Sequence, residues 1–261
     1  MNVKTRLFLI LFFLGLSGVV SFLLVDLSAL MRLISVAGTD VPTVTPALKI
    51  LSLIQPTVLL AVAVLTGVAL APRVGLSSPF AEALAAGRSA VPALRPQLVP
   101  GFLGALAGAL SVILSAAVFK PFLTTETIER IEEFTRLLPI PTRLLYGGVT
   151  EELLLRWGLM TLLVWATWRL FQKRFTKPTS ICFIAAILLS AFVFGLGHLP
   201  IALIVLPETT LAVVLFVIVA NSAFGIVAGY LYWKYGLESA IVAHMLGHVV
   251  LAAASYAGAY F

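Results

Sequence analysis

Two adjacent carboxylates and a guanidinium lie in one of the most apolar stretches of this sequence. Residues 148–158 read GVTEELLLRWG, so Glu151, Glu152 and Arg156 stand among leucine, valine and tryptophan. On insertion scales a charged side chain at the centre of a bilayer costs about 2.5–3.5 kcal/mol, and such residues generally face a cavity and mark function. Three charges so close together therefore need partners, and they predict a functional site.

The spacing supplies one of these partners. Glu152 and Arg156 are four residues apart with the carboxylate on the N-terminal side, which is the favourable order for a helical ion pair. This pair could be structural or could act directly in the site. Glu151 lies about 100° further round the helix and has no obvious partner there. Desolvation makes an unpaired carboxylate more basic, which suits a general base that acts on water.

All three histidines of the chain also fall in apolar stretches. His244 and His248 are four residues apart, so both rings project from one helix face, as paired metal ligands do. His198 follows Phe194 by four residues, and we expect Phe194 to pack against it and position its ring. Together with the glutamate pair, the histidines predict one shared polar site. Asn221 is expected to make an interhelical hydrogen bond.

Two kinds of chemistry fit these residues. Zinc takes imidazole ligands and, in catalytic sites, three protein ligands with an open position for water; His198, His244 and His248 would be those ligands. In a metal-free alternative, a carboxylate and a histidine activate water while another histidine and its neighbour one turn away donate hydrogen bonds to the oxyanion. The spacing alone leaves both open.

The composition identifies the class of protein. The chain has 261 residues, of which 61% are hydrophobic and 11% charged, whereas soluble domains have roughly 45–50% apolar and about 25% charged residues. We therefore expect an all-α, polytopic bundle of membrane helices, forming one integral membrane domain over residues 1–261. The net charge of +6 comes without a basic patch interleaved with aromatics, so nucleic-acid binding is not expected. The lipid bilayer is the expected partner, and the oligomeric state is not predicted.

Stretches of about 20 apolar residues are long enough to span a bilayer as helices. The sequence GHLP at 197–200 interrupts the fifth such stretch, so the expected count is seven spans, or eight if the fifth is broken. Residues 124–138 have apolar side chains on one helix face and charges on the other, which predicts a helix on the membrane surface, over the mouth of a cavity or as a simple connector. The seven predicted spans are 6–26, 47–71, 98–119, 143–170, 180–206, 209–233 and 237–260.

The basic residues predict an orientation. The run RLFQKRFTK at 169–177 carries most of the bias, and Lys and Arg are enriched in cytoplasmic loops. We therefore expect a cytoplasmic N-terminus in a plasma-membrane protein. In this arrangement Glu151 and His244 differ in depth by more than about 10 Å, at about 1.5 Å per residue. A single site then requires tilted helices, a deep cavity or a broken fifth span.

Three separated motifs occur in a suggestive order. EELLLR (151–156) has the form E-E-x-x-x-R, FGLGH (194–198) has the form F-x-x-x-H, and GLESAIVAHMLGH (236–248) ends in H-x-x-x-H. Their order and spacing resemble the CAAX prenyl protease and bacteriocin-processing family of intramembrane proteases, also called CPBP or Abi. The resemblance covers residues 141–250, which we take as the catalytic core.

The resemblance implies an intramembrane endopeptidase, either a metalloprotease or a glutamate-dependent peptidase. It implies that Glu151 activates water and that His198 assists it or binds metal. His244 and His248 would be oxyanion donors or metal ligands. The implied substrate is a peptide or protein in or at the membrane, for example a prenylated or leader peptide.

The same resemblance gives Glu152 and Arg156 the role of shaping the site. This chain departs from the family at position 248, where many members have asparagine and this chain has His248. A third histidine makes a zinc site easier to build. It also departs at Trp157, which follows Arg156 where many members have glycine.

Two other functions are compatible with the charged residues. A proton- or divalent-cation-coupled transporter could use the glutamates and histidines as a relay. A non-catalytic membrane scaffold could retain the ion pair only for folding. Replacing Glu151 by glutamine separates the three, because only the protease would lose peptide hydrolysis while remaining folded.

Overall fold

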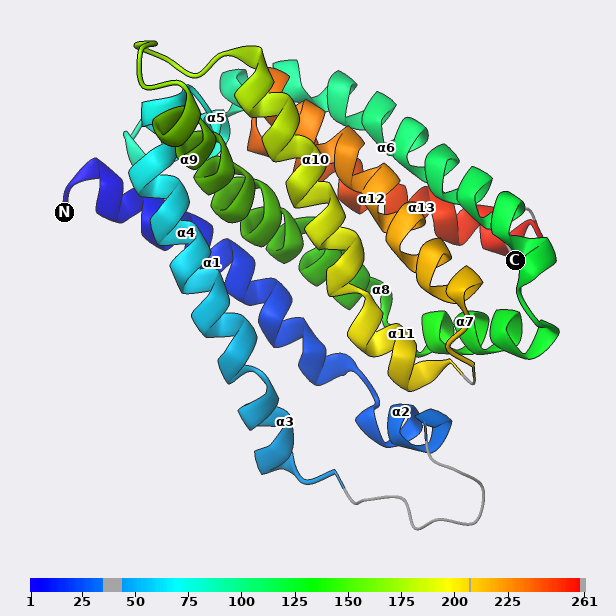
Figure 1. Ribbon diagram of the computed structural model, residues 1–261. Helices are drawn as coiled ribbons and strands as arrows, with labels where there is room; N and C mark the ends of the chain where they lie inside the picture. Colours follow the sequence, from blue (N-terminus) through cyan, green and yellow to red (C-terminus); the bar gives the residue numbers. More distant parts are fainter. Residues whose placement is uncertain (35–43, 207, 259–261) are drawn as a thin grey trace.

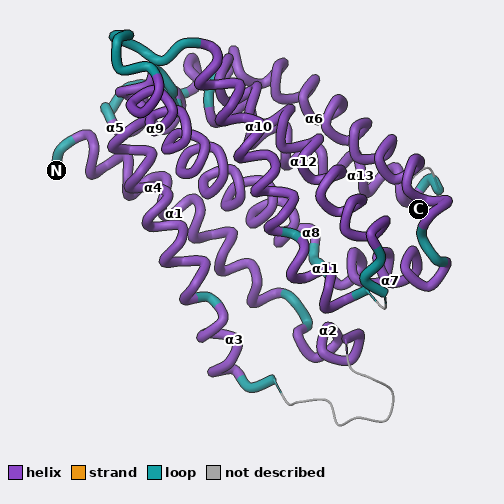
Figure 2. The backbone as a smooth tube through the Cα atoms, in the orientation of Figure 1, coloured by secondary structure: helices purple, strands orange, loops and turns teal. Residues whose placement is uncertain are grey.

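The computed structural model describes residues 1–34, 44–206 and 208–258, and all regular elements of that part are helical (Figures 1 and 2). The long helices are α1 (Val3–Ser21), α4 (Ile54–Val74), α6 (Val91–Phe119), α10 (Ser180–Gly197), α12 (Leu211–Lys234) and α13 (Leu237–Tyr256). The shorter ones are α2 (Leu27–Ile34), α3 (Pro46–Ser52), α5 (Pro79–Ala85), α7 (Thr125–Leu137), α8 (Ile140–Thr142), α9 (Thr161–Phe171) and α11 (Leu199–Val205).

Six helical segments of the described chain are long and apolar enough to cross a membrane: Val3–Leu24, Pro46–Val74, Val91–Phe122, Ser180–Val205, Leu211–Lys234 and Leu237–Tyr256. The prediction of a polytopic helical membrane protein is thereby confirmed. The expected span over 143–170 is not among the six. It is helical from α8 to α9, but two π-helical segments interrupt its regular α-helix, so no single α-helix of spanning length forms there.

The outside of the bundle is apolar. Along α6, the exposed side chains include Val99, Leu103, Leu106 and Leu110, which recur every three or four residues and so form one face. An apolar face of this extent would be unfavourable in water. It fits the hydrocarbon interior of a bilayer instead, where lipid chains cover it.

The chain from Ile140 to Phe171 lies in the middle of the bundle. It contains two π-helical segments, η3 (Arg143–Thr150) and η4 (Leu153–Met160), joined by a short α-helical step at Glu151 and Glu152. α1 packs on η3 and α4 packs on η4, while α13 and α10 cover the other side (Figure 1). This central segment is therefore braced from several directions.

Small residues permit this close packing. A Cβ atom added to Gly18 of α1 would lie 2.2 Å from Thr150 Oγ1, and one added to Gly158 would lie 2.9 Å from the Cα of Ala63. Both contacts are too short for any side chain. α1 and α4 can therefore approach the central segment only because glycine occupies these positions.

The fifth apolar stretch is broken, as GHLP predicts. α10 ends at Gly197 and α11 begins at Leu199, so His198 lies at the break. The predicted surface helix is present as α7, with Ile131 and Phe134 packed inward while Glu133 is exposed. α2, α7 and α11 gather at one end of the bundle, and α5 lies at the opposite end (Figure 1).

Candidate active site

The two glutamates stand where the helix geometry changes twice. π-helical turns are rare in proteins, and those that occur are often found at functional sites. Threonines accompany both: Thr150 Oγ1, which donates to the Gly15 carbonyl at 2.7 Å, also lies 3.3 Å from the Leu145 carbonyl, and Thr161 Oγ1 lies 3.2 Å from the Arg156 carbonyl. In each case the hydroxyl reaches a carbonyl five residues back, which matches the wider π-helical turn. The local sequence thus supports the irregular geometry around the glutamates.

Glu152 and Arg156 form the ion pair that their spacing predicts. Their Oε2 and Nε atoms are 3.2 Å apart, and both side chains are fully buried. Arg156 Nη2 also donates to the Gly225 carbonyl at 3.1 Å, and its Cζ lies 5.0 Å from the centroid of the Phe194 ring. The guanidinium is therefore held by three different helical segments.

His244 joins this pair from α13. Its Nδ1 lies 2.8 Å from Glu152 Oε1; because a carboxylate only accepts hydrogen bonds, Nδ1 carries the proton that is donated. The opposite ring atom, Nε2, lies 4.0 Å from Glu151 Oε2. The Glu151 side chain is 18% exposed, whereas that of Glu152 is 0% exposed. Glu152 thus has a partner at each oxygen, the hydrogen bond from His244 and the ion pair with Arg156, whereas Glu151 is partly exposed.

This contact resolves the expected difference in depth between Glu151 and His244. α13, which carries His244, and the segment that carries Glu151 enter from opposite ends of the bundle and pass each other along their middle turns (Figure 1). The close approach depends on Gly147 and Gly148. A Cβ on Gly147 would lie 2.5 Å from His248 Nε2, and one on Gly148 would lie 2.3 Å from Met245 Cγ.

Sequence reasoning missed this glycine pair, although the pair is visible immediately before the EE motif. Glycines placed a turn ahead of buried charges are a signal that another backbone approaches there. The pair is what allows His244 to reach the glutamates and His248 to lie against Gly147.

His248 extends the cluster on α13. Its ring stacks on that of His244, with centroids 5.0 Å apart. Its Nε2 atom is buried and has no hydrogen-bond partner among the described residues. A buried, unsatisfied ring nitrogen is costly, so this atom is available to a group that enters the site.

His198 reaches the cluster indirectly. Its Nδ1 lies 2.8 Å from the Phe194 carbonyl, and its ring packs edge-on against the Phe194 ring at 4.7 Å. The Phe194 ring is in turn 5.9 Å from that of His244. Phe194 therefore packs against His198, as the spacing predicts, and it also packs against His244.

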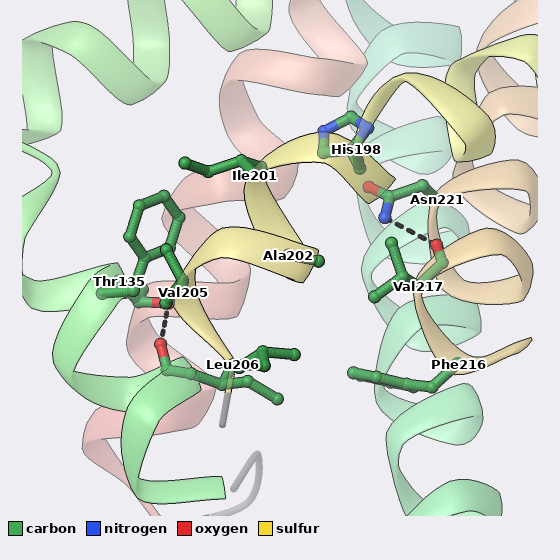
Figure 3. A pocket seen from close by; sticks show the side chains of 11 residues that line it. Thr135, His198, Ile201, Ala202, Val205, Leu206, Phe216, Val217 and Asn221 are labelled. Carbon is green, nitrogen blue, oxygen red and sulfur yellow. Dashed lines mark hydrogen bonds between the residues drawn. The ribbon is translucent and has the colours of Figure 1, made fainter. Parts of the chain in front are cut away.

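A cavity of about 220 Å³ opens beside His198, between α7, α11 and α12 (Figure 3). Asn221 also lines it, with its Nδ2 donating to the Val217 carbonyl one turn earlier at 2.8 Å. The described hydrogen bond of Asn221 is thus within α12, and the expectation of an interhelical bond was wrong.

The sequence predicts His198, His244 and His248 as possible ligands of a metal ion. Among the described residues, no three side chains of histidine, cysteine, aspartate or glutamate are grouped so that they could hold a metal ion. His244 Nδ1 is occupied by Glu152, and the Phe194 ring packs against both His198 and His244. In this arrangement His198, His244 and His248 do not form a ligand set, and zinc stays a prediction from the sequence.

Comparison with known families is consistent with these motifs. Residues 133–250 match the family model described as type II CAAX prenyl endopeptidase Rce1-like. The matched segment contains the glutamate pair and all three histidines. This part of the chain is thus similar to the Rce1-like family of intramembrane proteases, in agreement with the resemblance seen in the sequence. No curated protein and no solved structure gave a significant match.

Proposed function

We propose that this protein is an intramembrane endopeptidase in which Glu151 deprotonates the water that attacks a peptide bond. The observation that carries the proposal is the different treatment of two adjacent carboxylates. Glu152 accepts a hydrogen bond from His244 and forms an ion pair with Arg156, while Glu151 is partly exposed and lies 4.0 Å from His244 Nε2. A general base needs a free carboxylate beside a group that can exchange protons or orient water.

His244 has a defined part in this mechanism. The hydrogen bond from its Nδ1 to Glu152 fixes the ring, so Nε2 faces Glu151 and the space where water would bind. In this scheme His248, whose Nε2 has no hydrogen-bond partner among the described residues, and His198 would stabilise the oxyanion that forms on the attacked carbonyl. Arg156 does not touch substrate in this scheme; it holds Glu152 in place.

The proposed substrate is a peptide or protein in or at the membrane, with prenylated CAAX-type peptides as the first class because of the name of the matched family. Leader peptides are the second class. We also propose that Ile140–Phe171 crosses the bilayer as a seventh span and that residues 1–261 form one membrane domain, with its catalytic core at 141–250. The N-terminus would be cytoplasmic, in the plasma membrane.

The direct test is cleavage of a farnesylated CAAX-type peptide by the protein reconstituted in liposomes, followed by mass spectrometry. We expect wild-type protein to release the C-terminal fragment and Glu151→Gln to be at least about 10²-fold slower. Glu129→Gln, a matched change on the exposed face of α7, should behave as wild type. Equal cleavage by wild type and Glu151→Gln would contradict the proposal.

The zinc prediction has its own test. His198, His244 and His248 are not grouped as a ligand set in the described arrangement, but they are the ligands that the sequence proposes for a metal, which would supply a polarised water. Metal analysis of protein purified without chelators, beside His248→Ala, measures this directly. Near-stoichiometric zinc that falls in the variant would support a metal site, whereas no metal in either preparation would leave the water to Glu151 and the histidines alone.

A further inference from the structure

The start of α13 is fastened to a distant part of the chain by a buried carboxylate. Glu238, in the first turn of α13, is 7% exposed, and its Oε1 atom accepts three hydrogen bonds from the beginning of α5. The donors are Ser78 Oγ at 2.6 Å, the Phe80 amide at 3.0 Å and the Ala81 amide at 3.1 Å. The two amides are among those that a helix leaves free at its N-terminus, so Glu238 caps α5 from 160 residues after Ser78 in the sequence.

The residues on either side of Glu238 are also bonded to other segments. The Leu237 amide donates to the Ser77 carbonyl at 3.1 Å. The Ser239 amide donates to Oε1 of Gln97 in α6, and the Ser239 hydroxyl donates to the Gln97 carbonyl, both at 3.2 Å. The first turn of α13 is therefore held by the start of α5 on one side and by α6 on another.

A carboxylate is an unfavourable group to bury where helices meet. Glu238 Oε2 is buried and has no hydrogen-bond partner among the described residues, and a buried polar atom without a partner opposes folding. Apolar side chains of similar volume often stabilise a fold as well as buried charged groups do. What the three hydrogen bonds to Oε1 add is direction, because hydrogen bonds require defined distances and angles. They fix both the height and the rotation of the helix that carries Glu238.

The height of α13 matters because of the histidines on the same helix. His244 follows Glu238 by six residues of unbroken α-helix, about 9 Å along its axis, and its Nδ1 lies 2.8 Å from Glu152 Oε1. One turn further, His248 lies so close to the central segment that a Cβ atom on Gly147 would be 2.5 Å from its Nε2 atom. These contacts leave little room for α13 to slide or turn.

We propose that Glu238 is a positioning residue of the active site: its hydrogen bonds to α5 hold α13 at the height and rotation at which His244 meets Glu152. The proposal rests on the peptidase function proposed above, and it adds to that function a residue that does not touch substrate. The partners of Glu238 in α5 lie outside residues 133–250, which match the family model. The geometry of the site thus depends on a contact between the matched segment and the chain before it.

Three variants separate this contact from its surroundings. Glu238→Ala removes the acceptor, whereas Glu238→Gln keeps a side-chain oxygen of the same reach that accepts hydrogen bonds without the charge. Glu82→Ala is the control, because Glu82 Oε1 accepts a hydrogen bond from the amide of the same Ser78 at 3.1 Å, but this bond lies within the α5 segment. The probe is the farnesylated CAAX-type peptide in liposomes, with kcat expressed per folded molecule as counted by size-exclusion chromatography before reconstitution.

For Glu238→Ala we expect kcat per folded molecule to fall by at least about tenfold with KM little changed, since a misplacement of about 1 Å can lower activity by about 10²-fold. Glu238→Gln should recover most of this loss, and Glu82→Ala should keep the wild-type kcat. A merely structural role would lower the amount of folded protein and leave kcat per folded molecule unchanged. Hydrogen exchange over residues 237–248, measured by mass spectrometry in detergent, should be faster in Glu238→Ala and unchanged in Glu82→Ala.

If Glu238→Ala does not fold, Ser78→Ala takes its place. This variant removes the shortest of the three hydrogen bonds and leaves the carboxylate with its two amide donors. It should lower kcat per folded molecule by less than the loss of all three bonds, and an unchanged kcat would overturn the proposal.

The other contradicting results are distinguishable from a failure of the peptidase function. A wild-type kcat in folded Glu238→Ala would show that the reaction does not need the anchor, and the peptidase function would stand. Equal losses of kcat in Glu238→Ala and Glu82→Ala would assign the effect to the α5 segment and not to the anchor. If wild-type protein cleaves no peptide, the proposed function fails on this substrate class. Hydrogen exchange then decides whether Glu238 holds α13, and unchanged exchange in Glu238→Ala overturns it.

Discussion

Glu151 and Glu152 are neighbours in the sequence but have different surroundings. Glu152 is fully buried between Arg156 and His244, so its charge is balanced within the protein. Breaking a buried ion pair leaves the remaining charge without compensation, which costs about 3–5 kcal/mol. At the scale of single residues, the Glu152–Arg156 ion pair therefore stabilises the fold, and Glu151 is the carboxylate that we propose to act as the base.

The chain contains a second glutamate–arginine pair with the same spacing, which serves as a control. Arg136 and Glu132 on α7 are also four residues apart, with a 2.7 Å contact, but the Arg136 side chain is 75% exposed. Exposed pairs of this kind contribute about 0–1 kcal/mol. We expect Arg156→Met to destabilise the protein by about 3–5 kcal/mol and Arg136→Met by less than about 1 kcal/mol. Denaturant unfolding in detergent micelles measures both, and similar losses would contradict the assignment.

At the scale of elements, the site depends on how closely α13 approaches η3. Gly147→Ala would place a Cβ atom 2.5 Å from His248 Nε2, so the His248 ring or α13 must move. A misplacement of about 1 Å can lower activity by about 10²-fold, and we expect a fall in kcat approaching that size with the fold retained.

Gly197→Ala is the control for this change, because a Cβ atom on Gly197 meets nothing within 4 Å. It should leave kcat unchanged. The double variant Gly147→Ala, His248→Asn shortens the clashing side chain and should recover part of the lost activity. If Gly147→Ala has full activity, the close approach of the two helices is not needed for the reaction. Steady-state cleavage of the farnesylated peptide provides all of these rates.

The elements that the sequence predicts well are those with a strong local signal. Apolar length predicts the long helices, GHLP predicts the break at His198, and the charge pattern predicts α7. The π-helical segments η3 and η4 were not predicted, because their residues are ordinary for a helix and the geometry comes from packing against α1, α4 and α13. The contact between His244 and Glu152 depends on tertiary packing too, so spacing within one helix cannot indicate it.

At the scale of the whole molecule, the first part of the chain holds in place the segment that carries the two glutamates. Thr150 Oγ1 donates to the Gly15 carbonyl of α1 at 2.7 Å, and Trp157 Nε1 donates to the Val64 carbonyl of α4 at 3.3 Å. Both donors come from the segment that carries the glutamates. The helices outside the family match therefore fix the position of the motif residues within it.

The architecture also predicts which parts share a membrane side. In a background with Cys182→Ala, single cysteines can be placed at the exposed positions Glu133 and Lys173, on either side of the Ile140–Phe171 segment. If that segment crosses the bilayer, a membrane-impermeant maleimide should label Glu133→Cys from one side only and Lys173→Cys from the other. Labelling of both from the same side would show that the segment does not cross.

The central claim is that one carboxylate of the pair performs the chemistry while the other holds the site together. The most direct measurement compares Glu151→Gln with Glu152→Gln for two properties at once, the kcat for peptide cleavage and the free energy of unfolding in detergent. We predict that Glu151→Gln loses kcat by at least about 10²-fold without losing stability, because its carboxylate is partly exposed and its contact with His244 Nε2 is 4.0 Å long. Glu152→Gln should lose stability. If Glu151→Gln keeps the wild-type kcat, or if the two variants lose stability equally, the division of roles is contradicted.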